Sequence, residues 1–323
     1  MIERRTALLL LALLAASPAA AQQRLAPDGA FAPDANAVHE GALLHQEPRI
    51  LGRIDIPATR ADVLIQPAGR QWDFFHEVVL HWYGAVILLG TVALLVAGYV
   101  LLGPLRLEAG RSGRRLVRFG SFERFAHWLN AVSFVALALT GLNMTFGKDL
   151  LRPLIGPDAF AEVAQWAKYV HNFASTGFVL GMVLICVLWL RDNMPARVDF
   201  EWLKQGGGFI KGKPVHAGRF NAGEKMVFWL SMAAAIAVIV TGYTLLFPFY
   251  FLDIFGMQLA QGLHALVAVL FMAIIAGHIY IGTLGTEGAF EAMGRGSVDL
   301  NWAREHHDLW AEEQLTQERI RTE

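Results

Sequence analysis

Residues 262–280 read GLHALVAVLFMAIIAGHIY, an apolar stretch with two histidines and no aspartate, glutamate, lysine or arginine. An apolar stretch of about 20 residues can cross a bilayer as an α-helix. His278 follows His264 by fourteen residues, which is about 21 Å along a helix and close to four full turns. Both histidines are therefore expected on one face of a membrane-spanning helix, at two depths.

Five apolar segments of this kind are predicted, over residues 79–103, 126–146, 168–190, 226–247 and 262–284. The composition agrees with them: 55% of the 323 residues are hydrophobic, 17% are charged, and the mean hydropathy is +0.41, whereas a soluble domain needs a more charged surface. We expect an all-α integral membrane protein, with a four-helix transmembrane bundle in residues 104–284 and one additional N-terminal transmembrane helix. The net charge of −1 gives no sign of nucleic-acid binding.

The N-terminal region is expected to be exported. Arg4 and Arg5, an apolar stretch over residues 7–16 and three alanines that end at Ala21 predict a signal peptide in residues 1–21. A retained anchor helix is the alternative, but the apolar stretch is too short to span a bilayer. The polar residues 22–78 would then form a periplasmic segment.

Loop charges predict the orientation of the helices. Arginine and lysine are frequent in residues 104–125 and 191–225 but scarce in 147–167 and 248–261. Because cytoplasmic loops carry the excess of basic residues, the first two loops are expected in the cytoplasm. The tail, residues 285–323, would lie there too. These features predict a multi-pass protein of the bacterial inner membrane, with a periplasmic mature N-terminus.

Four histidines lie within the apolar segments: His127, His171, His264 and His278. An imidazole in hydrocarbon is costly without a partner, so such residues are functional candidates, although a lone one is more often a hydrogen-bonded core residue. Successive helices alternate in direction, which predicts two pairs at matched depth. His127 and His278 would lie near the cytoplasmic side, and His171 and His264 near the periplasmic side.

Two facing imidazoles are the usual axial ligands of a low-spin haem, so these pairs predict two b-type haems. The chain has one cysteine and no C-x-x-C-H sequence, which excludes a covalent c-type haem and an iron–sulfur cluster of its own. Small residues near the histidines, among them Gly141, Gly177 and Gly277, would leave room for a macrocycle or serve helix packing.

Several motifs carry a resemblance to a known family. Within the apolar segments and their connections they are Phe122-Glu123-Arg124-Phe125-Ala126-His127-Trp128, Tyr169-Val170-His171, Arg219-Phe220-Asn221-Ala222-Gly223-Glu224-Lys225, Gly262-Leu263-His264 and Gly277-His278-Ile279-Tyr280. In the tail they are Gly296-Ser297-Val298-Asp299, Trp302-Ala303 and His306-His307. Together they resemble the gamma, or cytochrome b556, subunit of respiratory formate dehydrogenase, in its long form with an exported N-terminal segment and an added first helix.

The resemblance implies a membrane anchor and electron-transfer subunit of a formate:quinone oxidoreductase. A catalytic (alpha) subunit with molybdenum or tungsten would oxidise formate, and an iron–sulfur (beta) subunit would pass the electrons to this chain. The chain's two haem b groups, held by the four histidines, would then carry the electrons to a quinone. The chain itself would contain no formate-oxidising site.

The resemblance also implies that Asn221, Gly223 and His278 contact the quinone. The residues are compatible with that role, because Asn221 offers an amide and Gly223 permits close backbone approach at a helix start with free amide donors. Asn221 would equally serve as a helix cap that bonds those amides. The residues alone leave both interpretations open.

Two other functions fit some of the same features. Four histidines alone would also suit the cytochrome b subunit of a hydrogenase or a thiosulfate reductase, but the loop at 219–225 and the tail motifs favour formate dehydrogenase. A transporter or structural anchor that uses histidines for protons or packing is a third hypothesis. Transporters usually show internal repeats and broken helices, and the sequence gives no sign of either.

Overall fold

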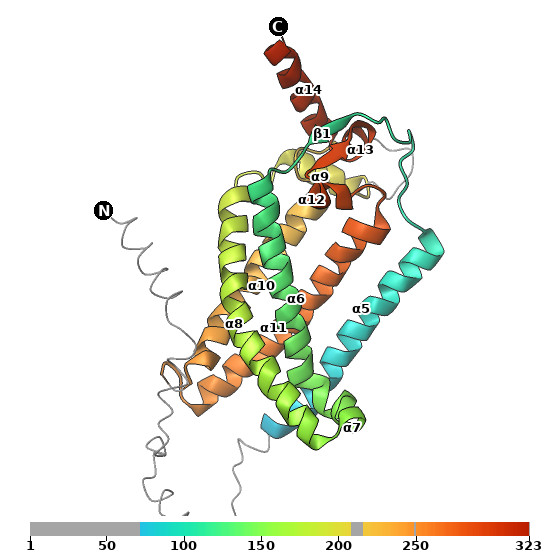
Figure 1. Cartoon of the computed structure of the whole chain (residues 1–323). Helices are drawn as coiled ribbons and strands as arrows, with labels where there is room; N and C mark the ends of the chain where they lie inside the picture. The colour runs from blue at the N-terminus through green and yellow to red at the C-terminus, as the bar shows by residue number, and fades with distance from the viewer. Residues whose placement is uncertain (1–71, 208–215, 249, 323) are drawn as a thin grey trace, which may run out of the picture.

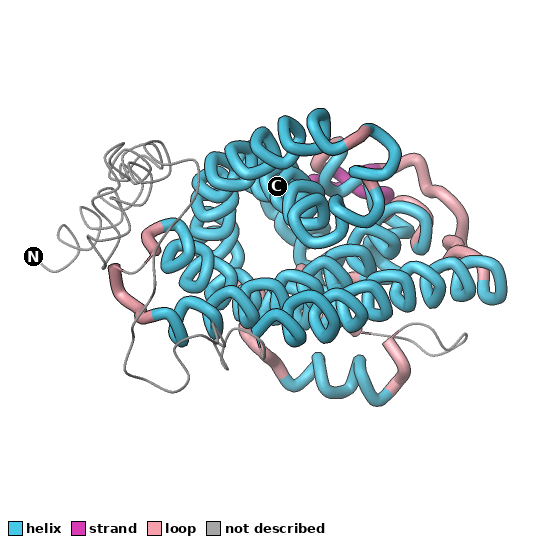
Figure 2. Tube along the Cα trace, turned by 90° about the horizontal axis from the view of Figure 1, so that it is seen from below, coloured by secondary structure: helices cyan, strands magenta, loops and turns pink. Residues whose placement is uncertain are grey.

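The computed structural model describes residues 72–207, 216–248 and 250–322 (Figure 1). The described part has five helices long and apolar enough to cross a membrane: Trp72–Leu102, Ser121–Leu150, Pro157–Trp189, Ala222–Leu246 and Ile254–Gly285. They confirm the predicted all-α membrane fold. Figure 2 shows a molecule built almost entirely of helices, with two short strands. The predicted signal peptide and most of the predicted periplasmic segment lie outside the described residues.

The spans are named here as in Figure 1. The first is η1 (Phe75–Leu80) continued by α5 (His81–Leu102). The next two are α6 (Ser121–Leu150) and α8 (Pro157–Trp189), joined by the short α7 (Arg152–Ile155). The last two are α10 (Ala222–Leu246) and α11 (Ile254–Tyr280), which continues as η2 (Ile281–Gly285).

The helices pack in two antiparallel pairs. α6 lies along α8, α10 lies along α11, and α8 joins the pairs through α10, while α5 lies against α11 at the side (Figure 1). α6 and α8 approach closely, because a Cβ on Gly181 would lie 2.8 Å from Cα of Asn130, and one on Gly177 would lie 2.6 Å from Oγ of Ser133. Gly177 therefore serves helix packing, the second of its two expected roles.

The helices begin earlier than the apolar segments predicted. The first span starts at Trp72, so residues 72–78, assigned above to the periplasmic segment, are helical. α8 starts at Pro157 instead of residue 168. Hydropathy detects only the apolar part of a helix, whereas proline in the first turn and an acidic residue beside it also favour a helix start. His171, expected near the beginning of its helix, consequently lies near the middle.

One end of the bundle carries a folded cap, which we define as residues 104–120, α9 (Arg197–Lys204) and residues 286–322. The tail contributes α12 (Phe290–Gly294), β2 (Ser297–Asp299), α13 (Leu300–His306) and α14 (Asp308–Thr322). Strand β1 (Arg115–Val117) pairs antiparallel with β2, and Leu116 lies opposite Val298. Both side chains are buried, so the first loop and the tail share one small core.

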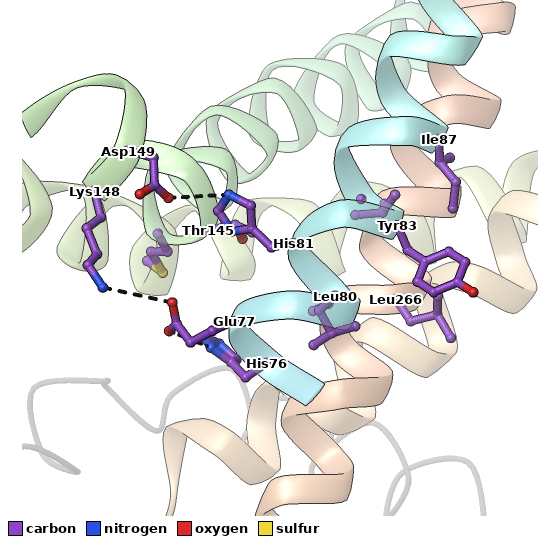
Figure 3. Close-up of a pocket in the computed structure, with 14 residues that line it drawn as sticks. His76, Glu77, Leu80, His81, Tyr83, Ile87, Thr145, Lys148, Asp149 and Leu266 are labelled. Carbon is purple, nitrogen blue, oxygen red and sulfur yellow. Dashed lines mark hydrogen bonds and ion pairs between the residues drawn. The ribbon is translucent and has the colours of Figure 1, made fainter. Parts of the chain in front are cut away.

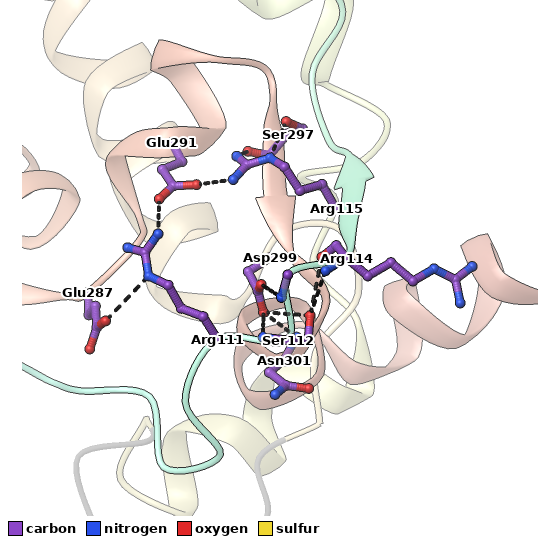
Figure 4. A network of polar contacts seen from close by, with 10 residues as sticks. Arg111, Ser112, Arg114, Arg115, Glu287, Glu291, Ser297, Asp299 and Asn301 are labelled. Atoms are coloured by element: carbon purple, nitrogen blue, oxygen red, sulfur yellow. Dashed lines mark hydrogen bonds and ion pairs between the residues drawn. The ribbon is translucent and has the colours of Figure 1, made fainter.

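Asp299 fixes the first loop to the tail (Figure 4). Its carboxylate accepts hydrogen bonds from the backbone amides of Ser112, Gly113 and Asn301, and from the Ser112 hydroxyl. Burial alone would raise the pKa of Asp299, but the bonds from Ser112, Asn301 and Gly113 together lower it. The tail motif quoted above thus holds the cap together.

Candidate functional site

The structure brings the four membrane histidines together in two pairs. The ring centroids of His127 on α6 and His278 on α11 are 6.3 Å apart. Those of His171 on α8 and His264 on α11 are also 6.3 Å apart. These are the pairs predicted from depth, and α11 contributes one histidine to each. The first pair lies toward the cap, and the second lies toward the end of the bundle that carries α7.

The spacing within each pair fits one metal ion between the rings. A metal–imidazole bond is about 2.0 Å long and the ring centre lies roughly 1.1 Å beyond the nitrogen, so two rings on opposite sides of one metal have centroids roughly 6.2 Å apart. No hydrogen bond joins the two rings of either pair in the described structure, and none of the four residues is fully buried. Each ring therefore keeps accessible surface inside an apolar bundle.

Threonine hydroxyls hold the pair near the α7 end. Thr140 Oγ1 lies 2.8 Å from Nδ1 of His171, and Thr241 Oγ1 lies 3.0 Å from Nδ1 of His264. Sequence reasoning missed both threonines. A signal was present, because Thr-Gly occurs at 140–141 and again at 241–242, once in each of the helices that precede these histidines.

The glycines of these Thr-Gly pairs lie against the imidazoles. A Cβ on Gly141 would be 3.6 Å from Cε1 of His171, and one on Gly242 would be 3.1 Å from Cε1 of His264. Gly277, beside His278, has nothing within 4 Å of such a Cβ. A Cβ at Gly277 would therefore meet open space, while Gly141 and Gly242 allow close approach of the rings.

The pair near the cap has no such hydrogen bonds. Nδ1 of His127 is buried without a hydrogen-bond partner in the described structure, and no hydrogen bond to the His278 ring occurs there either. A buried polar atom without a partner is uncommon in folded proteins and calls for an explanation such as a missing ligand. A haem iron bound at Nε2 would not satisfy this Nδ1, so it is the ring spacing of this pair that fits a haem held by two histidines.

Asn221 is a helix cap in the structure. Its Oδ1 accepts a hydrogen bond from the Glu224 amide at 2.9 Å, and Glu224 Oε2 accepts one from the Asn221 amide at 3.0 Å. The Nδ2 group has no partner among the described residues and remains a free donor. A Cβ on Gly223 would lie 3.2 Å from the Trp202 side chain of α9, so any side chain there would require Trp202 to shift. No hydrogen bond joins Asn221 or Gly223 to His278 in the described structure.

Charged side chains at the cap are paired. Arg118, which is buried, donates to both carboxylate oxygens of Glu224 at 2.9 and 3.0 Å. Lys225 Nζ lies 2.9 Å from Asp199. Glu224 and Lys225, at the start of α10, therefore both have a charged partner in the cap.

His307 lies buried beside this network. It donates from Nδ1 to the Gly218 carbonyl at 2.9 Å and is 1% exposed. Burial, together with the nearby charge of Arg118, lowers the pKa of His307 to about 3. His307 is therefore a neutral structural residue of the cap, and the described residues contain no cluster of three or more His, Cys, Asp or Glu suited to a metal ion.

His76 and His81 lie apart from the two pairs. They line a cavity of about 90 Å³ between the first span, α6 and α11 (Figure 3). His81 Nε2 is 3.3 Å from Asp149, and His76 Nδ1 is 3.2 Å from Glu77. A cavity of this volume has room for water molecules.

Paired imidazoles in a transmembrane bundle define a membrane cytochrome b. A family model described as prokaryotic cytochrome b561 matches residues 118–296, more than half of the chain, and the chain belongs to this family. Membership implies haem b binding, electron transfer and a multi-pass location in the inner membrane. The first span lies before the matched residues.

Curated relatives are named as formate dehydrogenase subunits. The chain is 28% identical over 207 residues to the nitrate-inducible cytochrome b556(Fdn) subunit of Escherichia coli K12, covering 62% of this chain and 92% of that protein. It is 29% identical over 203 residues to the cytochrome b556(fdo) subunit of the same strain, covering 61% and 92%. Identity to the Haemophilus influenzae cytochrome b556 subunit is 27% over 209 residues, covering 62% and 84%. These matches confirm the resemblance found from the motifs.

Proposed function

We propose that this chain is the membrane electron-transfer subunit of a formate dehydrogenase complex, and that it carries electrons through two haem b groups to a quinone. The observation that carries this proposal is the pair of equal 6.3 Å spacings, His127 with His278 and His171 with His264. The relatives named above support formate as the electron source.

The four histidines would act as axial ligands. A haem held by two of these histidines would supply reversible one-electron chemistry. His264 and His278 set the two depths, because fourteen residues of helix separate them by about 21 Å. That distance covers most of the ~30 Å hydrocarbon layer, so the pairs suit electron transfer from one side of the membrane to the other.

The quinone is proposed to bind at the cap end, near the start of α10. Asn221 Nδ2 is a free donor there and would bond a quinone oxygen, and the Gly223 backbone offers no side chain to obstruct it. With the cap in the cytoplasm, electrons would move inward and protons would be taken up from the inner side. Each elementary charge moved across the membrane then conserves about 2.3 kcal/mol per 100 mV.

The partners follow from the same proposal. A catalytic subunit with molybdenum or tungsten would oxidise formate in the periplasm, and an iron–sulfur subunit would deliver electrons to the pair His171–His264. The cytochrome b subunit of a hydrogenase or a thiosulfate reductase remains the alternative. It would use the same haem ligands with a different partner.

Purification of the native complex separates these alternatives. Mass spectrometry of the co-purifying subunits, combined with haem spectra after addition of formate or hydrogen, is the experiment. The proposal predicts an iron–sulfur subunit, a molybdenum or tungsten subunit, and haems reduced by formate. Reduction by hydrogen and not by formate would assign the chain to a hydrogenase and contradict the proposed partner.

A further inference from the structure

We propose that Thr140 and Thr241 are positioning residues that lock His171 and His264 in the tautomer needed for ligation and lower the reduction potential of the haem between them. The inference rests on the proposed function, because it assumes that this pair holds a haem. It assigns a role to two residues of α6 and α10 that do not touch the iron.

Counting protons gives the direction of each hydrogen bond. Thr140 Oγ1 lies 2.7 Å from the Ala136 carbonyl, and Thr241 Oγ1 lies 2.7 Å from the Ala237 carbonyl. A hydroxyl has one proton to donate, and here a helix carbonyl receives it. With the hydroxyl proton on that carbonyl, Oγ1 accepts from Nδ1–H of the histidine.

This direction fixes the state of the opposite ring nitrogen. A neutral imidazole carries its proton on one nitrogen only, so a proton on Nδ1 of His171 or His264 leaves Nε2 with a free lone pair. That lone pair is the group that binds a metal. The hydrogen bond at Nδ1 also fixes the ring orientation and increases the basicity of the ligating nitrogen.

The same arrangement of a threonine and a glycine against a histidine ring occurs twice, on different helices. Thr140 and Gly141 on α6 contact His171, while Thr241 and Gly242 on α10 contact His264. In each case the threonine bonds the ring nitrogen and the glycine lies against the ring carbon Cε1. The repetition within one pair of histidines points to a requirement of the pair and not to a local accident of packing.

The other pair lacks these threonine hydrogen bonds, so the two haems should differ in reduction potential. Neither the His127 ring nor the His278 ring has a hydrogen-bond partner in the described structure, and Nδ1 of His127 is buried. A more basic ligand stabilises the oxidised iron, and ligand hydrogen bonding is one of the protein's means of setting a haem potential. The haem at His171–His264 should therefore have the lower potential, which favours electron flow toward the cap.

An ordinary role for these threonines must be excluded by the test. Threonine in a transmembrane helix often bonds a carbonyl one turn back, and Thr145 on α6 does so with the Gly141 carbonyl at 3.0 Å, with no hydrogen bond to a histidine among the described residues. Thr145 is therefore a matched control for Thr140. Valine has the shape of threonine and lacks the hydroxyl.

The experiment is a spectroscopic redox titration of the purified holo-complex with Thr140→Val, Thr241→Val, Thr140→Ser and Thr145→Val. Thr140→Val and Thr241→Val should each raise the midpoint potential of one haem component. We expect about a tenfold change in the oxidised-to-reduced ratio at a fixed potential, equivalent to ~59 mV for one electron. Thr140→Ser should restore the wild-type value, and Thr145→Val should not change it.

Three results would overturn the inference. They are a shift in Thr140→Val no larger than in Thr145→Val, a shift in the component that His127→Leu removes, or failure of Thr140→Ser to restore the potential. If Thr140→Val loses the haem altogether, recovery of that haem in Thr140→Ser supports the positioning role and its absence contradicts it. A wild-type chain without this haem would instead refute the proposed function, and the inference with it.

Discussion

The side chains of Asn221 and Glu224 each accept a hydrogen bond from the other's backbone amide, at 2.9 and 3.0 Å. This reciprocal helix N-cap closes the first turn of α10 at the loop proposed to bind quinone. The helix N-cap uses only the side-chain oxygen Oδ1 of Asn221 and leaves Nδ2 free. The structural and functional roles of this residue can therefore be separated by substitution.

Asn221→Ser should keep the helix N-cap and lose the side-chain amide donor. Serine caps helices about as well as asparagine, so both haems should be retained and should still be reduced by formate. A hydrogen bond to the quinone contributes about 1.4 kcal/mol at most. Its loss should therefore slow haem reoxidation by quinone by up to about tenfold. Stopped-flow spectroscopy of the formate-reduced complex measures this rate.

Asn221→Leu is the comparison for this prediction, because it also removes the cap and should destabilise the helix start by about 1 kcal/mol. Its reoxidation should be at least as slow as that of Asn221→Ser. If Asn221→Ser reoxidised its haems at the wild-type rate, the quinone would have to bind at another site.

The buried His307 predicts that the cap loosens in acid. Burial lowers its pKa to about 3, Arg118 acts in the same direction, and Glu224 opposes both. In an unfolded cap the pKa returns to about 6.5, so between these values the unfolded state binds more protons. The contribution to stability is complete above pH 6.5 and decreases as the pH falls below it, by up to about 1.4 kcal/mol per unit.

Limited proteolysis of the cap between pH 7.5 and 5, normalised to an unfolded substrate, measures this loss. Carboxylates of the cap titrate near pH 4 when unfolded, so this range isolates the histidines. His307→Asn keeps a donor in place of Nδ1, which bonds the Gly218 carbonyl, and should show a flatter dependence on pH. Parallel curves for the two proteins would show that His307 does not control the cap.

Orientation in the membrane is a separate prediction. A reporter fused after Arg115 in β1 should be active in the cytoplasm, and one fused near Asp158 at the start of α8 should be active in the periplasm. The physical reason is the excess of basic residues in the loops at the cap end. Activities on the opposite sides would overturn the charge argument and the predicted export of the N-terminus together.

Hydropathy and helix periodicity were enough to predict the spans and the two histidine pairs. Depth follows from position along a helix, so His264 and His278 could be assigned to different levels from their spacing alone. Helix ends were harder to predict, because α8 continues through polar residues as far back as Pro157, outside the apolar segment.

Contacts between distant segments could not be read from the sequence. Thr140 on α6 meets His171 on α8, and Arg115 lies opposite Asp299 in the β1–β2 pair although the two are far apart in the sequence. Such contacts depend on how helices are rotated and docked, which the hydrophobic pattern of a membrane helix specifies poorly. The sequence alone also left open whether Asn221 is a helix N-cap, which the hydrogen bond from the Glu224 amide shows.

Haem analysis of His127→Leu and His171→Leu tests the central claim most directly. The wild-type chain should contain two b haems by the pyridine haemochrome assay and no covalent haem. Each variant should retain one haem, and low-temperature optical spectra should show that the two variants lose different components. Loss of the same component in both variants, or a single haem in the wild-type chain, would contradict the assignment of His127–His278 and His171–His264 as two separate ligand pairs.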